Sequence, residues 1–214
     1  MRVRADLNIS LDGFGTTTDG TPENPMGEDW MRLVDAYIAT RTFRSRVLGD
    51  TSGAGTTDVD DRYASAYFEG VGAEIMGAGM FGLHTYPDDP DWEGWWGENP
   101  PFHVPVFVLT HHARAPLVME GGTTFHFVTE GIEVALARAR DAAQGKDVRV
   151  GGGVSVIQQY LRQHLIDEMH IAISPVLLGA GERLFEGVNL PTLGYSCTEH
   201  VATPRATHVV FTRV

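Results

Sequence analysis

The sequence predicts an α/β fold in which one mixed, mainly parallel sheet carries helices on both faces. Three patterns support this prediction. Residues 2–11 alternate between apolar and polar side chains, which is typical of a strand with one buried face. Strand and helix patterns then alternate between residues 104 and 178. Two more strand patterns, 195–201 and 206–213, are typical of a closing antiparallel hairpin.

In the N-terminal half, the polar face of the first strand, with Asp6 and Asn8, is expected to border a cleft or solvent. The turn Asp12-Gly13 ends this strand. The remaining segments of this half follow in order: a helix over 28–42, a loop over 49–61, a helix over 60–69, a short strand over 73–76 and a proline-rich irregular segment over 86–105.

In the C-terminal half, apolar runs predict four strands at 104–110, 125–129, 147–150 and 169–178. Thr129 is expected to cap a helix that runs to about residue 143, with Glu130 at its positive end. A second helix is expected over 153–165, where the apolar residues share one face.

The composition of the 214 residues restricts the function classes. We expect one domain, residues 1–214. A net charge of −12 with only one lysine argues against nucleic acid as a partner. Cys197 is the only cysteine, and no signal segment or apolar run long enough for a membrane span is present, so we expect a cytoplasmic protein. No histidine spacing typical of a metal site is found, and the composition suggests a bacterial source.

The stretch IMGAGMFG, residues 75–82, fits the G-x-G-x-x-G fingerprint of Rossmann dinucleotide sites. Such a site needs a long helix after the glycines and an acidic residue after the next strand. Here Pro87 and Pro90 leave no room for that helix. The context therefore argues against a Rossmann site, and a tight turn after a strand is the simpler interpretation.

A second glycine cluster, Gly151, Gly152 and Gly153, lies between a predicted strand and a predicted helix. Glycines let a ligand approach the backbone, and a helix N-terminus offers free N–H groups to an anion. Ser155 adds a hydroxyl donor. Two glycine loops at the carboxyl ends of strands in one sheet favour a ligand site at that edge.

Four segments resemble the dihydrofolate reductase-like fold, and within it the RibD C-terminal domain, the reductase domain of riboflavin biosynthesis. These segments are LNISLDGFGTT (7–17), AEIMGAGMFG (73–82), VPVFVLTHHAR (104–114) and residues 148–185, with the glycine triplet and Pro-Val-Leu-Leu-Gly-x-Gly. The resemblance implies a three-layer α/β fold, a stand-alone bacterial member, a homodimer and an NADPH-dependent reductase.

The resemblance also implies where NADPH (NADP) binds. The residues that match cofactor-binding positions are Asn8, Gly15, Gly77, Ala78, Gly79, Met80, Thr110, His111, Arg114, Gly151, Gly152, Gly153, Val154 and Ser155. Many relatives have Gly-Arg-x-Thr in the second loop, where this chain has Gly77-Ala78-Gly79-Met80. Arg114, helped by His111 or His112, is then the candidate partner for the 2′-phosphate. NADH or a flavin is the alternative cofactor.

A reductase also needs a proton source and a group that matches the edge of a small heterocyclic substrate. Asp6 and Asp12 are the candidate catalytic residues, with surface or turn roles as their alternatives. Asp35 on the first helix is a weaker candidate, by analogy with the folate-binding acid of dihydrofolate reductases. Tryptophans 92, 95 and 96 form either a lid or, more simply, loop packing.

The predicted function is reduction of a pterin- or pyrimidine-like substrate by hydride transfer from NADP(H). Two alternatives remain open from the sequence: a reductase that uses NADH or a flavin, and a dinucleotide-binding or interaction protein without catalysis. Turnover distinguishes the enzymes from the binder, and cofactor preference distinguishes the two enzymes.

Overall fold

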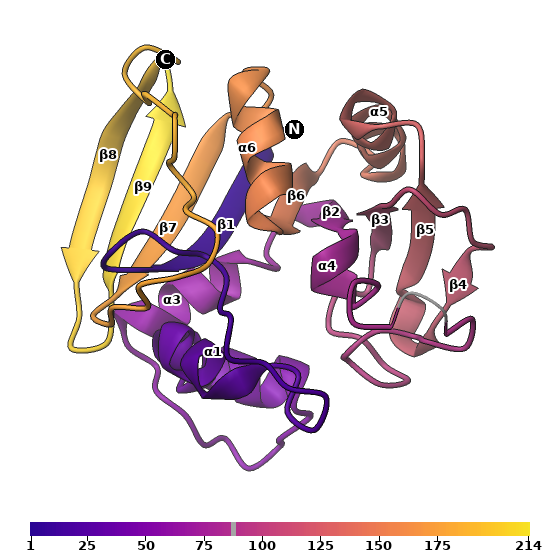
Figure 1. The fold of residues 1–214 in the computed structure, drawn as a ribbon, viewed down its shortest axis with the longest axis horizontal. Coiled ribbons are helices and arrows are strands. Elements are labelled where there is room, and N and C mark those ends of the chain that lie inside the picture. Colours follow the sequence, from indigo (N-terminus) through magenta and orange to yellow (C-terminus); the bar gives the residue numbers. More distant parts are fainter. Residues whose placement is uncertain (87–88) are drawn as a thin grey trace.

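A single sheet with the strand order β4-β5-β3-β2-β6-β1-β7-β9-β8 runs through the computed structural model, which describes residues 1–86 and 89–214 (Figure 1). Pro87 and Asp88, which belong to the predicted irregular segment 86–105, lie outside the described residues. The strand bounds are β1 Val3–Ser10, β2 Val71–Gly77, β3 Pro105–Leu109, β4 Leu117–Val118, β5 Thr124–Val128, β6 Asp147–Gly152, β7 Glu168–Ser174, β8 Tyr195–Ala202 and β9 Thr207–Arg213.

The pairing confirms the predicted mixed sheet. Strand β1 lies at its centre and pairs in parallel with β6 and β7. Strands β2, β3 and β5 continue the parallel part, while β9 and β8 form the antiparallel hairpin at one edge. The two-residue strand β4 at the other edge was not predicted, because so short a segment carries no readable periodicity.

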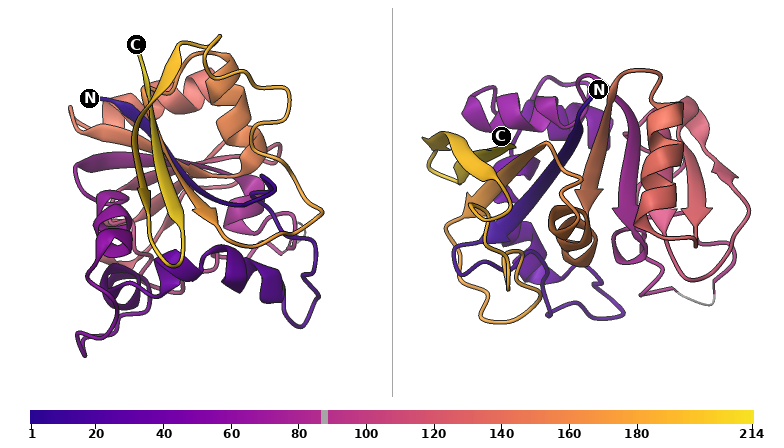
Figure 2. Two further views of the ribbon diagram at one scale, coloured as in Figure 1. Left: turned by 90° about the vertical axis from the view of Figure 1, so that its left-hand side faces the viewer. Right: turned by 90° about the horizontal axis from the view of Figure 1, so that it is seen from above.

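Two helices cover one face of the sheet, α5 (Ile132–Ala142) and α6 (Val154–Arg162). Figure 2 shows them on the side opposite α1 and α3. Val3, Ala5 and Ile9, the apolar side of β1, pack into the same core as Leu136 and Ile157. The alternation in β1 therefore correctly identified the main apolar face.

The other face is covered by α1 (Gly27–Leu33), α2 (Asp35–Ile38) and α3 (Val59–Ala66). Asp6 and Ser10, on the polar side of β1, are buried beneath this layer. The prediction that this side borders an open cleft or solvent is wrong. The chain between β1 and β2 folds back over it and turns it into a polar interior layer.

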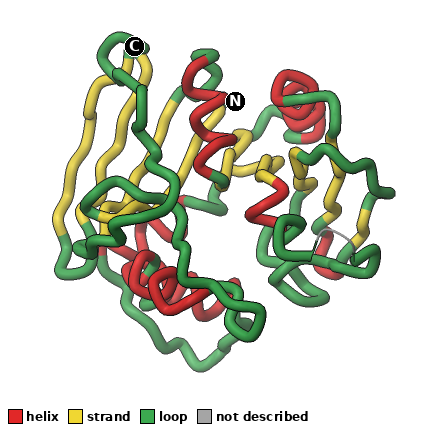
Figure 3. The backbone as a smooth tube through the Cα atoms, viewed as in Figure 1, coloured by secondary structure: helices red, strands yellow, loops and turns green. Residues whose placement is uncertain are grey.

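The predicted helix 28–42 is interrupted, and Figure 3 shows its pieces as separate helical segments joined by loops. The backbone leaves helical geometry at Val34, and a π-helical turn follows at Phe43–Val47. The Thr40 hydroxyl donates to the Tyr37 carbonyl and accepts from the Phe43 N–H. A side chain that hydrogen-bonds to nearby backbone in this way competes with the helical pattern.

Helix α5 starts later than predicted. Gly131, with φ of 97°, is its N-cap, and Thr129 does not cap it. The Glu130 carboxylate instead accepts the backbone N–H of Thr129 and pairs with Arg138. The predicted cap is wrong because Gly131 occupies the N-cap position and the Thr129 hydroxyl donates to the Glu130 carboxylate instead.

In the described residues, no helix is both long and apolar enough to cross a membrane.

Candidate functional site

The two glycine loops lie side by side at the carboxyl ends of neighbouring strands. Strands β2 and β6 are paired, with Met76 opposite Gly152. A Cβ atom added to Gly153 would lie 3.9 Å from the Gly77 Cα atom. The helix after the first loop, α4 (Ala78–Phe81), has only four residues. A Rossmann site needs a longer one, so the rejection of that fingerprint holds.

The second loop leads into α6, whose N-terminus is open. Its N-cap residue is Gly153, with φ of 69°, and no side chain among the described residues caps it. The first turn contains no acidic residue; Val154 is buried there and Ser155 is exposed. Free N–H groups and the helix dipole therefore make this end suitable for an anion such as a diphosphate.

Met80 in the first loop lies against Gly152 in the second. A Cβ atom on Gly152 would lie 2.8 Å from Met80 Sδ, so the loop tolerates no larger residue unless Met80 moves. Gly79 is equally close to the ring of His84, 2.9 Å from its Nδ1 atom. We call these adjacent loops the glycine surface, since a side chain at Gly152 or Gly79 would collide with Met80 or His84.

The end of β1 adjoins this surface. A Cβ atom on Gly15 would lie 2.7 Å from Val154 Cγ2, which places the turn after β1 against the start of α6. Asp12 accepts the backbone N–H groups of Leu178 and Gly179 and the hydroxyl of Ser10. These bonds, with Ser10 first, lower the pKa of Asp12 to about 2. Asp12 is therefore a poor proton donor near neutral pH and fastens the loop after β7.

Arg114, the predicted partner of the 2′-phosphate, is held in part by the protein itself, while its Nη1 atom has no hydrogen-bond partner among the described residues. Its Nη2 atom donates to the carbonyls of Pro90 and Trp92, at 2.7 and 3.0 Å, and its guanidinium lies over the ring of Phe127. At the same sheet edge, the Thr110 side chain is buried, whereas His111 and His112 are exposed. His111 and His112 are therefore accessible to a ligand at the β3 end.

The tryptophans pack against the protein, as the simpler interpretation predicted. Trp92 donates from Nε1 to the Phe81 carbonyl, and Trp96 packs against Phe102 and Phe125. Trp95 contacts Trp92 edge to face. The cluster therefore closes the core under α4.

Asp6 belongs to a buried ionic group on the helix-covered face. Arg149 Nε lies 2.9 Å from Asp6 Oδ2, and Arg149 Nη1 lies 2.9 Å from Glu74 Oε1. Although burial favours a neutral carboxyl, nearby His170 and Arg149 lower the pKa of Asp6. Burial raises the pKa of Glu74 to about 7. The prediction that Asp6 points into an open cleft is therefore wrong.

The ionic group explains the first glycine of the triplet. A Cβ atom on Gly151 would overlap Glu74 Oε1 and lie 3.1 Å from Arg149 Nη1. We expect Gly151→Ala to lower the free energy of unfolding by about 1–3 kcal/mol, as overpacked interiors do, measured by urea denaturation. In a Glu74→Ala background the same change should have little effect. Equal losses in both backgrounds would contradict this explanation.

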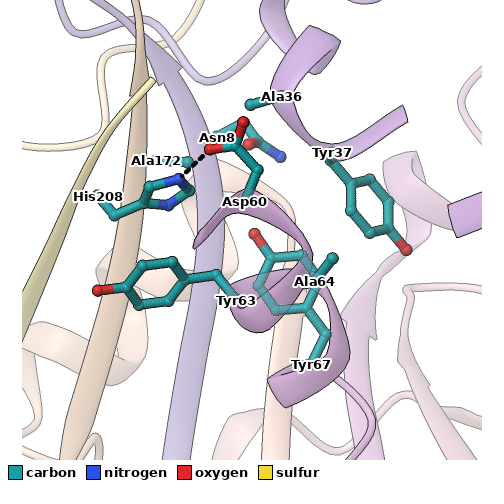
Figure 4. Close-up of a pocket in the computed structure, with 9 residues that line it drawn as sticks. All are labelled: Asn8, Ala36, Tyr37, Asp60, Tyr63, Ala64, Tyr67, Ala172 and His208. Atoms are coloured by element: carbon teal, nitrogen blue, oxygen red, sulfur yellow. Dashed lines mark hydrogen bonds and ion pairs between the residues drawn. The ribbon is translucent and has the colours of Figure 1, made fainter. Parts of the chain in front are cut away.

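A small cavity lies on the same face, between β1, β7, β9 and the helices α2 and α3 (Figure 4). Its volume of about 10 Å³ is close to the minimum for one water molecule. Two oxygen atoms that line it, Asp60 Oδ2 and Asn8 Oδ1, have no hydrogen-bond partner among the described residues. The lining residues are Asn8, Ala36, Tyr37, Asp60, Tyr63, Ala64, Tyr67, Ala172 and His208.

The other oxygen of Asp60 is held by a histidine pair. Asp60 Oδ1 lies 2.8 Å from His208 Nε2, and His208 Nδ1 lies 3.0 Å from His170 Nε2. The Tyr63 ring stacks on both imidazoles, with centroids 4.4 and 4.2 Å away. The arrangement fixes the carboxylate so that Oδ2 faces the cavity, as Figure 4 shows.

Asp60 was missed in the sequence, and Asp35 was considered instead. Asp35 is exposed on α2 and pairs with Arg205. Asp60 lies in the first turn of α3, where acidic residues are common for reasons of the helix dipole alone. The signal that could have identified it is His208, which faces α3 only after the C-terminal hairpin has formed.

Comparisons with known proteins agree with this architecture. The family model of the RibD C-terminal domain matches residues 2–209. The uncharacterized protein YwjB of Bacillus subtilis is 32% identical over 59 residues, which cover 28% of this chain and 33% of YwjB. The matched stretch thus spans about a third of that relative.

Solved structures share the fold at low sequence identity. A provisionally named riboflavin biosynthesis protein of Shewanella sp. PV-4 is 22% identical, with a TM-score of 0.62 and coverage of 100% of this chain and 99% of that one. Dihydrofolate reductase of Enterococcus faecalis, complexed with NADP(H), is 12% identical, with a TM-score of 0.53 and coverage of 99% and 96%.

A third solved structure is a deaminase/5-amino-6-(5-phosphoribosylamino)uracil reductase of Thermotoga maritima. It is 16% identical, with a TM-score of 0.50 and coverage of 100% of this chain. Only 56% of the Thermotoga chain is covered, so this chain corresponds to part of that protein. Together these structures confirm the dihydrofolate reductase-like fold.

Proposed function

The chain belongs to the family of the RibD C-terminal domain, and from this premise we propose that it is an NADP(H)-dependent reductase of a small pterin- or pyrimidine-like heterocycle. The glycine surface at the ends of β2 and β6 would hold the cofactor. The cavity beneath β1, with Asp60, would recognise the substrate ring.

The observation that carries the cofactor proposal is the contact between the two glycine loops at the open N-terminus of α6. The backbone N–H groups of Val154 and Ser155, with the Ser155 hydroxyl, would hold the diphosphate. Gly15, which packs against Val154, would lie near the nicotinamide end. When bound, NADPH supplies a hydride.

Asp60 and Asn8 favour a ring with N–H donors. A carboxylate oxygen and an amide oxygen without partners both accept hydrogen bonds, as the N–H and amino groups of pterins and aminopyrimidines require. A cavity of about 10 Å³ cannot hold a ring, so substrate binding would require α2, which forms one wall, to move outward. The acidic lining disfavours a phosphate next to this site.

One observation favours the alternative cofactor NADH. Ala78 offers no cation to a 2′-phosphate, and the Arg114 guanidinium is engaged by backbone carbonyls. The exposed side chains of His111 and His112 would then be the partners of the phosphate. The relative affinities for NADPH and NADH distinguish these two cases.

We expect the purified chain to bind NADPH saturably and more tightly than NADH, as measured by quenching of tryptophan fluorescence. Gly153→Val should abolish this binding, because its side chain would project between the loops. Gly70→Val is the matched control, since both glycines have nearly the same φ, 69° and 70°, and Gly70 has open space around it. Thermal unfolding checks that both variants fold.

Tighter binding of NADH than of NADPH would overturn the choice of cofactor. Loss of NADPH binding in both Gly153→Val and Gly70→Val would leave no evidence that the glycine surface holds the cofactor. Turnover is then measured as NADPH oxidation with two probes, dihydrofolate and 5-amino-6-(5-phosphoribosylamino)uracil, the substrates in the names of the solved structures. Binding without turnover of either would favour a non-catalytic dinucleotide-binding protein.

A further inference from the structure

Two hydrogen bonds link the buried histidine pair to Asp60, and Asp6 lies at the other end of this line without a hydrogen bond to it. Neighbouring strands create it: Asp6 is opposite His170 in β1 and β7, and Ala172 is opposite His208 in β7 and β9. His170 Nδ1 lies 3.6 Å from Asp6 Oδ1, beyond hydrogen-bond distance. This nitrogen has no hydrogen-bond partner among the described residues. The side chains of both histidines are at least nine-tenths buried.

The geometry restricts where the protons lie when both rings are neutral and Asp60 is ionised. A carboxylate only accepts, so His208 must carry its proton on Nε2, which faces Asp60. His208 Nδ1 then accepts, so His170 must donate from Nε2. His170 Nδ1 is therefore bare and lies 3.6 Å from Asp6 Oδ1, so an added proton there would lie beside a carboxylate.

An added proton has two positions that keep both hydrogen bonds. In the first, His170 is an imidazolium beside Asp6, and Asp60 is ionised. In the second, the Nε2 proton of His170 has passed to His208 Nδ1, and the Nε2 proton of His208 has passed to Asp60 Oδ1. Both rings and Asp60 are then neutral, and both hydrogen bonds run in the opposite direction.

We propose that Asp60, His208 and His170 act as one proton relay, which carries a proton between His170 and the carboxyl group that faces the cavity. Its role in turnover rests on the proposed function. In turnover, Asp60 carries a proton on Oδ2, which faces the cavity, and gives it to the substrate nitrogen while the adjacent carbon takes the hydride. At the same time the Nε2 proton of His208 passes to Asp60 Oδ1 and the Nε2 proton of His170 passes to His208 Nδ1, so that the His170 imidazolium becomes neutral. After product release, a proton from water that enters the cavity returns to Oδ2 and the two relay protons pass back, which restores the starting state.

The surroundings suit this role. Burial, first of all, lowers the pKa of His208, so that this ring transmits a proton rather than keeping one. Asp6 stays ionised beside His170 because Arg149 holds it. The charged or titratable groups that face the two rings are Asp6 on β1, Arg149 on β6, Asp60, Arg62 and Tyr63 on α3, Tyr67 at the C-cap of α3, and Glu199 on β8.

The test needs no substrate. Long-range ¹H–¹⁵N spectra of the full chain, labelled at histidine, are recorded from about pH 5 to about pH 9, the range in which histidine changes charge. We expect both rings to be Nε2–H tautomers at high pH and to change together at one midpoint. In Asp60→Asn, His208 should no longer take part in the transition, because an amide cannot take the proton.

His126 stacks on Phe107, away from the relay, and serves as an internal control. The ¹H–¹⁵N signals of its ring should be the same in every variant. Asp61→Asn is the matched variant, since Asp61 is in the same helix but accepts the Thr42 N–H instead. Its spectra should match the wild type. Separate midpoints for His170 and His208 in the wild type, or unchanged transitions in Asp60→Asn, would overturn the relay.

Turnover gives the second measurement. His170→Gln keeps an N–H donor toward His208 but cannot hold the extra proton, so we expect kcat to fall by about tenfold or more, with the affinity for NADPH unchanged. Coupled titration in a chain that turns over neither probe would support the relay and overturn the reductase proposal. An unaltered kcat and pH profile in His170→Gln would overturn the relay and leave the reductase proposal standing.

Discussion

Arg149→Met should lower the free energy of unfolding by about 3–5 kcal/mol, the typical effect of removing one partner from a buried ion pair. Arg149 is the cation that links Asp6 and Glu74 beneath α3, and its guanidinium also lies over the ring of Tyr67. Methionine fills much of the same volume but leaves two buried carboxyl groups without a counter-charge.

The effect of Arg149→Met should grow with pH. Burial raises the pKa of Glu74 from its ordinary value of 4.5 to about 7. A carboxyl group with a raised folded-state pKa contributes stability below its unfolded-state pKa and loses it as the pH rises through the folded-state value. Without Arg149 the ionised form of Glu74 is even less favourable, so the deficit increases from about pH 4.5 upward.

Urea denaturation at several pH values measures this effect. Arg138→Met is the control, because its pair with Glu130 is about half-exposed and should hardly affect the transition midpoint. Adding Asp6→Asn and Glu74→Gln to Arg149→Met should restore part of the lost stability, since no buried charge then remains unpaired. A deficit that is small and the same at every pH would show that Arg149 does not compensate the buried carboxyl groups.

The sheet could be predicted because its signals are local. The alternation in β1, the glycine triplet before α6 and the two closing strands each lie within about a dozen residues, where periodicity is informative. No local sequence signal shows which segment covers the second face of the sheet. The 60 residues between β1 and β2 determine whether Asp6 faces solvent, and Thr40 breaks the helical pattern there through its own hydrogen bonds.

The candidate site was predictable in part for the same reason. Both glycine loops were identified, since a glycine cluster after a strand is a sequence pattern. The polar layer was not, because Asp6, Glu74, Arg149 and His170 come from four different strands and face one another only through the register of the sheet. Each residue by itself reads as an ordinary polar position in a strand.

Asp60→Asn should reduce the rate of NADPH oxidation by about 10²-fold or more, the usual contribution of a proton-transferring group. Asparagine can still accept the His208 N–H through its oxygen, so the helix and the histidine pair keep their positions. Its amide nitrogen then faces the cavity in place of Oδ2. The amide nitrogen of asparagine donates hydrogen bonds, whereas Oδ2 of aspartate accepts them from the N–H groups of the substrate ring. The amide also cannot deliver a proton to the substrate.

The measurement is a single-turnover decay of NADPH absorbance, with whichever of dihydrofolate and 5-amino-6-(5-phosphoribosylamino)uracil the wild type reduces. The dissociation constant of NADPH should stay unchanged, because the glycine loops lie at the ends of β2 and β6, away from the residues that line the cavity. Asp35→Asn, an exposed acid on α2, is the matched control and should keep the wild-type rate.

A wild-type rate in Asp60→Asn would remove the cavity from the mechanism, and the acid would then have to be sought at the nicotinamide end, near Gly15. A lower rate that recovers fully at low pH would also argue against Asp60, because an amide cannot regain the lost proton.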